Sequence, residues 1–197
     1  MIRLTFVLAV LATGPAFGAT GTDPDWPCIQ RKQPHLSMGQ VWTGPIPDEA
    51  VLELARDPQI AQLAERLEQR RLPMPDAEAA IAEFAETAGN AELTALMQAI
   101  FERIERDRGA LIAGIARYGQ AQQDMSQRIE DQRAAMAALE AAEPPDFDAI
   151  DAAETTLDWE QRIFTERGQS LTYVCETPVI LEQRVFALGR AIVTHLD

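Results

Sequence analysis

The chain has 197 residues and carries 31 acidic against 17 basic side chains, a net charge of −14 at pH 7. A surface this negative disfavours nucleic acid and anionic lipid, and favours basic partners or cations. The chain contains two cysteines and two histidines, and no two of these residues stand at the short spacing of the common zinc and haem motifs. Those motifs are therefore excluded.

The first 18 residues have the pattern of a secretory signal peptide. Arg3 supplies a short positive region, Leu4–Ala12 is almost wholly apolar, and Ala16 and Gly18 place small residues before a cleavage site. We expect cleavage after Gly18. No later run reaches about 18 apolar residues, so no membrane span is predicted in the mature chain.

The basic residues also indicate a source and a compartment. All of them except Lys32 are arginines, and alanine is abundant, which is typical of a bacterial genome of high GC content. A bacterial signal peptide without an anchor predicts the periplasm, with secretion as the alternative. After cleavage, 16 basic residues face 31 acidic ones, because Arg3 is removed.

Cys28 and Cys175 are the two cysteines, one near each end of the mature chain. In an oxidising compartment they are expected to form one intramolecular disulfide. Pairing between two chains, or two free thiols, are the alternatives.

Residues 19–47 are predicted to form an irregular arm. Five prolines and three glycines deny this stretch a regular helix or strand. Trp26 and Trp42 nevertheless have large apolar side chains that favour burial, and disordered segments are poor in such residues. We therefore expect an extended, non-helical arm that packs on the rest of the protein and is attached there by Cys28.

The remainder, residues 48–197, is predicted to be all-α. Residues 48–88 should form two or three short helices, because Asp48, Asp57 and Asp76 are good N-caps before apolar stripes. Residues 90–143 contain no proline and repeat apolar residues at nearly heptad spacing, which predicts one long helix. Gly109, Gly114 and Gly119 are positions where this helix could bend. Arg108, Gln122 and Gln132 interrupt the apolar seam, and such residues commonly set the register of a two-helix coil.

Pro144 and Pro145 stop the long helix, and residues 146–197 should return along it, with a kink near Pro178. The predicted fold is a long, coiled-coil-like antiparallel hairpin, with the short helices at its base and the arm beside it. This register places Cys175 opposite about Gly114. The distal half, about residues 118–166, should protrude as a two-helix stalk.

Motifs that carry enzyme chemistry are absent from the sequence, including a glycine-rich phosphate loop and a nucleophile elbow. A metal- or haem-binding bundle is an alternative, with His35, Met38 and His195 as the ligands. A weaker alternative is an enzyme with a site between the arm and the hairpin. We assign no catalytic residue and no cofactor.

The leading hypothesis is a non-enzymatic interaction protein: an adaptor, an assembly factor or an accessory subunit. Its partner should be another periplasmic protein, with a basic surface favoured by the charge of this chain. Candidate contact residues lie in the arm and on the distal half of the long helix: Trp26, Arg31, Lys32, Trp42, Met125, Ile129, Met136 and Leu139.

Overall fold

The computed structural model describes residues 25–197, which form six helices and no strands. The predicted signal peptide, residues 1–18, lies outside the described residues, as do residues 19–24 of the arm. The helices are α1 (Met38–Val41), α2 (Glu49–Leu54), α3 (Pro58–Glu68), α4 (Met74–Ala85), α5 (Asn90–Glu140) and α6 (Phe147–Val193). The predicted all-α fold is confirmed.

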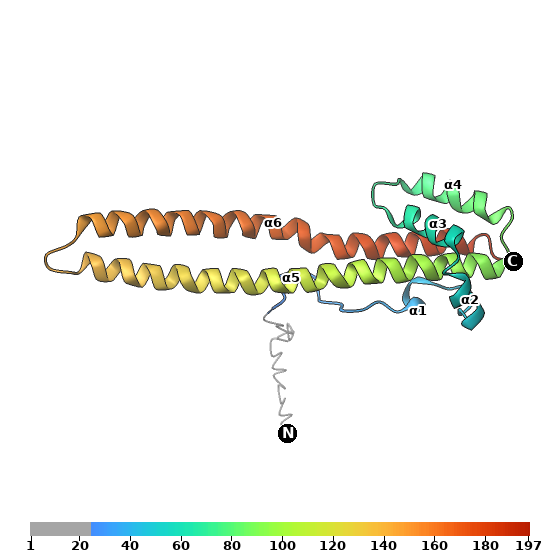
Figure 1. Ribbon diagram of the computed structural model, residues 1–197, viewed down its shortest axis with the longest axis horizontal. Coiled ribbons are helices and arrows are strands. Elements are labelled where there is room, and N and C mark those ends of the chain that lie inside the picture. The colour runs from blue at the N-terminus through green and yellow to red at the C-terminus, as the bar shows by residue number, and fades with distance from the viewer. Residues whose placement is uncertain (1–24) are drawn as a thin grey trace, which may run out of the picture.

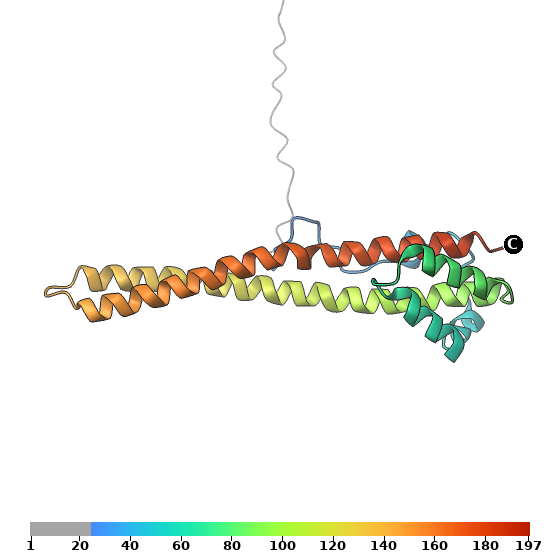
Figure 2. The ribbon, with the colours of Figure 1, turned by 90° about the horizontal axis from the view of Figure 1, so that it is seen from above.

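Helices α5 and α6 form the predicted antiparallel hairpin, and the two ribbons lie side by side along the whole molecule (Figures 1 and 2). The turn at Pro144 and Pro145 joins them, and Asp146 caps α6 by accepting a hydrogen bond from the amide of Ala149 at 3.1 Å. At the opposite end, the amide of Asp197 donates to Asn90 Oδ1 at 3.2 Å. The chain terminus therefore closes the base of the hairpin.

The helix ends differ from the predicted bounds by a few residues. Helix α5 ends at Glu140 rather than 143, and α6 ends at Val193 rather than 197. The N-cap of α5 is Gly89, whose amide donates to the carboxylate of Glu92 at 3.0 Å. Pro178 does not end α6, which continues through it.

The short helices pack around the base, as predicted. Helices α2 and α3 contact α5, and α4 contacts α6. Together they bury one large core, in which Leu67, Ile81, Ile100, Leu188 and Ile192 are fully buried. At roughly 25 cal/mol per Å² of apolar surface removed from water, this core is the main stabilising contribution to the base.

The arm contains one turn of helix that was not predicted. Ser37 lies at the N-cap of α1, and its amide donates to Gln40 Oε1 at 2.7 Å. This local bond favours a helical turn despite the surrounding prolines. The expectation of a wholly non-helical arm is therefore wrong over Met38–Val41.

The distal part of the hairpin is a stalk of two helices, which projects well beyond α1–α4 (Figure 1). A second, small cluster supports it: Met125, Ile129 and Leu157 are buried, with Met136, Ile163 and Phe164 packed around them. Among the described residues, α5 and α6 cover only each other here, so most of their surface faces solvent.

A buried arginine attaches the loop between α3 and α4 to α6. Arg184 is 8% exposed, and its Nε and Nη1 donate to the carbonyl oxygens of Leu67 and Leu72 at 2.8 and 3.0 Å. Leu67 lies in the last turn of α3, where carbonyls have no helical partner and a cation is favoured. Burial without a carboxylate lowers the pKa of Arg184, because desolvation disfavours the charged guanidinium.

Replacement of Arg184 by alanine is expected to lower the free energy of unfolding by about 2–4 kcal/mol. The change leaves two buried carbonyl groups without donors and opens a cavity beneath the loop. Urea denaturation followed by circular dichroism would measure it. Arg66→Ala, at an exposed position on α3, is the control and should change stability by less than about 0.5 kcal/mol. Equal effects of the two substitutions would contradict this role for Arg184.

Two helix glycines allow the arm to approach the hairpin closely. A Cβ at Gly189 would lie 2.6 Å from the carbonyl oxygen of Val41, and one at Gly119 would lie 2.9 Å from Cδ of Pro27. By contrast, a Cβ at Gly109 would meet nothing within 4 Å. The predicted bend positions therefore include one glycine, Gly119, that is required by the packing of the arm.

Opposite effects are expected from alanine at these sites. Gly109→Ala should stabilise the protein by up to about 1 kcal/mol, because alanine favours helix and the site has room. Gly189→Ala should destabilise it by about 1–3 kcal/mol, because the methyl group collides with backbone that cannot rotate away. Thermal unfolding of both variants would check the two signs, and stabilisation by Gly189→Ala would show that the arm yields easily.

Candidate functional site

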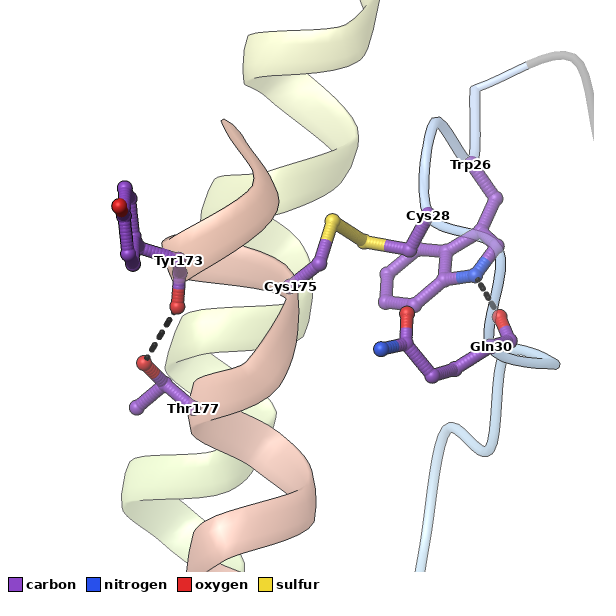
Figure 3. Close-up of a disulfide and its surroundings, with 6 residues drawn as sticks. All are labelled: Trp26, Cys28, Gln30, Tyr173, Cys175 and Thr177. Carbon is purple, nitrogen blue, oxygen red and sulfur yellow. Dashed lines mark hydrogen bonds between the residues drawn. A yellow bond between two sulfur atoms is a disulfide. The ribbon is translucent and has the colours of Figure 1, made fainter. Parts of the chain in front are cut away.

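The arm is attached to the middle of the hairpin by the predicted disulfide. Cys28 and Cys175 are bonded at an S–S distance of 2.02 Å, which joins the arm to α6 (Figure 3). Beside the bond, Trp26 Nε1 donates to the carbonyl oxygen of Gln30 at 2.6 Å, and Lys32 Nζ lies 5.8 Å from the centre of the indole ring. Trp26 is thus fixed at the start of the described arm.

A buried ion-pair cluster provides the second attachment. Arg108 on α5 is 1% exposed, and its Nε donates to Glu182 Oε1 on α6 at 2.7 Å. The same guanidinium donates to the carbonyl oxygens of Gln33 and Pro34 in the arm. Arg108 therefore joins α5, α6 and the arm. The sequence predicted a role for it in the register of the two helices, and the structure adds the attachment of the arm.

Glu105 extends this cluster by one turn of α5. Its Oε1 accepts hydrogen bonds from the amide of Leu36 and from His35 Nδ1, each at 3.2 Å. Its Oε2 lies 3.7 Å from Nη1 of Arg108. Consecutive arm residues are therefore bound to the pair of charges that α5 presents at helical i, i+3 spacing.

Between the arm and the hairpin lies a cleft with a volume of about 530 Å³. This size lies within the usual range for small-molecule sites, about 300–1,000 Å³. The apolar part of its wall comes from the arm, α5 and α6: Trp26, Leu36, Val41, Ile112, Val179 and Phe186. Its polar part includes four glutamines, together with Arg31, Arg108 and Glu182. This cleft is the candidate ligand site.

The predicted arm contacts divide between the cleft and the core. Trp26 and Arg31 line the cleft, and Lys32 stacks over Trp26. Trp42 is 6% exposed, packs in the base core and donates from Nε1 to the carbonyl oxygen of Pro45 at 2.8 Å. Trp42 is therefore not available at the surface, so its role in the described structure is to anchor the arm.

The predicted contacts on α5 are also partly internal. Met125 and Ile129 are 7% and 5% exposed, because they face α6 inside the stalk. These two candidate contact residues therefore do not lie at the surface of the described structure. Met136 and Leu139 are half-buried nearer the tip. Heptad spacing could not separate the two outcomes, because core and docking residues follow the same period.

The three predicted metal ligands are not brought together. His35 is exposed and bound to Glu105, whereas His195 lies at the base, two residues before Asp197, whose amide donates to Asn90. Asn90 and Glu105 are fifteen residues apart on α5, which corresponds to about 22 Å at 1.5 Å per residue. Met38 packs against the base core. Over residues 25–197, no group of three or more His, Cys, Asp or Glu side chains is arranged to hold a metal ion.

The stalk tip is a second surface of interest. From Glu140 to Glu160 the sequence has eight acidic residues and no basic one. In the same segment, Phe147 and Trp159 are 71% and 61% exposed. Among the described residues no third helix covers the stalk here, so both rings face solvent.

Comparisons with family models, with curated proteins and with solved structures found no match for this chain. No helix in the described part of the chain is long and apolar enough to cross a membrane. The disulfide is compatible with an oxidising compartment outside the cytoplasm.

Proposed function

We propose that this chain is a non-enzymatic interaction protein of the periplasm, an adaptor, assembly factor or accessory subunit that contacts a basic protein partner through its stalk. The observation that carries the proposal is the projecting tip, where the segment from Glu140 to Glu160 has eight acidic residues, no basic residue and an exposed Trp159. On the facing part of α5, Arg128 lies 3.9 Å from Glu160 and Arg133 pairs with Glu130, so most of the acids of this segment have no basic partner there. Such a surface attracts a positive partner over a Debye length of about 8 Å at physiological salt.

The two halves of the hairpin support different roles. The base half is covered by α1–α4 and the arm, whereas none of these elements, as far as residues 25–197 are described, covers the distal half (Figures 1 and 2). A stalk of this kind places a recognition surface far from the folded base. Exposed tryptophan is enriched where proteins bind each other, because one ring buries a large area at little entropic cost.

The test is photo-cross-linking in cells. A cross-linking residue at Thr155, exposed near the tip, should give a discrete adduct with one protein, and the same residue at Ala79, exposed on α4, should not. The adduct should weaken at high salt because exposed charges are screened. An adduct pattern that is the same from both positions would overturn the assignment to the tip.

Charge-matched variants sharpen this test. The tip variant replaces four exposed acids on α6: Asp148→Asn, Asp151→Asn, Glu154→Gln and Asp158→Asn. The control variant replaces four exposed acids of the base: Glu49→Gln, Glu78→Gln, Glu83→Gln and Glu86→Gln. Both change the net charge by the same amount. The tip variant should lose the Thr155 adduct several-fold, and retention of the adduct by the tip variant would contradict a role for these charges.

A further inference from the structure

The cleft between arm and hairpin is a preformed space. The disulfide holds the arm at Cys28, and Arg108 holds it again at Gln33 and Pro34. Figure 3 shows the side-chain amide of Gln30 beneath the indole of Trp26, on the side that faces α6. A site whose walls are fixed before binding loses little conformational entropy when a ligand enters.

The charge of the lining is opposite to that of the protein. Two arginines, Arg31 and Arg108, face one carboxylate, that of Glu182, in a chain of net charge −14. Arg108 and Glu182 satisfy each other at 2.6 Å. Arg31 makes no ion pair with any of the residues that the structure describes, and its side chain lies at the exposed edge of the cleft. Among the described residues, the guanidinium of Arg31 is therefore the one charged group of the cleft lining without an ion pair, and it lies beside an apolar wall.

We propose that this cleft binds an amphipathic monocarboxylate. The apolar body of the ligand packs against Ile112, Val179 and Phe186, and its carboxylate receives hydrogen bonds from Arg31 and from the amide of Gln30. A guanidinium matches a carboxylate through two parallel N–H donors. A multiply charged anion is disfavoured, because the cleft offers one guanidinium without an ion pair and the chain as a whole has a net charge of −14. This ligand site is separate from the stalk tip and does not depend on the proposed adaptor role.

Two kinds of molecule combine an apolar body with one carboxylate: a free fatty acid, and a peptide with an apolar carboxyl terminus. The experiment distinguishes them. Calorimetric titration of the full disulfide-bonded protein uses octanoate and N-acetyl-trileucine as probes, with octanamide and the trileucine amide as neutral counterparts. We expect saturable 1:1 binding of at least one carboxylate, and about tenfold weaker binding of its amide, the size expected for one charge-assisted hydrogen bond. The carboxylate that binds identifies the source.

Two variants locate the binding. Arg31→Gln should weaken the carboxylate about tenfold and leave the amide unchanged, whereas Arg66→Gln, the same charge change on α3, should alter neither. Phe186→Ala removes part of the apolar wall and should weaken both forms; Phe186 is 44% exposed, so folding should persist. Absence of binding by both carboxylates, equal binding of the amides, or unchanged binding by Arg31→Gln overturns the proposal.

Discussion

Replacement of both cysteines by serine, Cys28→Ser with Cys175→Ser, is expected to lower the free energy of unfolding by up to about 5 kcal/mol. The bond closes a loop with a sequence separation of 147 residues, so its loss frees a long unfolded chain. In the chain-entropy relation, a loop of this length lies at the upper end of what one disulfide contributes. Guanidinium denaturation of the oxidised protein and of the double variant would measure the difference.

In the double serine variant, the native fold should loosen only in the part of the arm near Cys28. Arg108 and Trp42 still hold the arm without the disulfide, and the base core does not involve Cys28. Helix content by circular dichroism should therefore be unchanged at room temperature. Trypsin should cleave the arm faster at Arg31 and Lys32, because the segment before Gln33 loses its attachment.

Chemical reduction of the native protein provides the matched control. The reduced wild-type chain should unfold at the same denaturant concentration as the double serine variant, and its mass should rise by the two hydrogens of the opened bond. A double variant that unfolds within about 1 kcal/mol of the oxidised protein would contradict the expected contribution of loop closure.

The hairpin was predictable because its determinants are local. Three signals define it: the helical spacing over residues 90–143, the two consecutive prolines, and the Asp146 cap. Each of them determines the backbone structure within a few residues of its own position in the sequence. The end of α5 was less predictable, because Ala141 and Ala142 favour helix but have no neighbour to pack against, and the helix ends at Glu140. Pairing of Cys28 with Cys175 followed from their being the two cysteines of the chain.

The arm could not be predicted in the same way, because its path depends on distant partners. Periodicity marked Arg108 as a polar interruption, but it could not show that the carbonyl groups of Gln33 and Pro34 would reach it. One signal was available: Arg108 and Glu182 lie the same number of residues from Pro145, one before it and one after it. Pairing positions across the turn would have placed the two side chains together.

The metal hypothesis failed for a related reason. His35 and Met38 are close in sequence, yet an extended arm sends neighbouring side chains to different surfaces. His35 reaches Glu105, and Met38 packs into the base core. Nearness along the sequence predicts shared ligation only where a helix or a tight turn brings the side chains to one side.

Removal of one charge from the Arg108–Glu182 pair is expected to be strongly destabilising, and the two single substitutions should differ. Glu182→Gln leaves a guanidinium that is 1% exposed, with Glu105 at 3.7 Å as its nearest remaining carboxylate. We expect a loss of about 3 kcal/mol, because Glu105 and the carbonyl groups of the arm compensate this buried charge only in part. Arg108→Met should cost about 2–3 kcal/mol, because Glu182 is 32% exposed and can regain water.

The double variant Arg108→Met with Glu182→Gln should be more stable than the sum of the two losses predicts. The attraction between Arg108 and Glu182 is lost in each single variant and can be lost only once, so we expect a coupling energy of at least about 1 kcal/mol, although Glu105 keeps its charge in the double variant. The pair Arg162–Glu166, which lies within α6 and has side chains 72% and 61% exposed, is the control. Its neutralisation should change stability by about 0.5 kcal/mol or less.

A local measurement separates a clamp on the arm from a general contribution to stability. The amide of Leu36 donates to Glu105, and Arg108 lies against that carboxylate. Arg108→Met should therefore accelerate hydrogen exchange at Leu36 far more than at Ile129 in the stalk, since opening of the arm needs no unfolding of the hairpin. Equal acceleration at the two amides would mean that Arg108 stabilises the molecule as a whole, and that the arm has no separate attachment there.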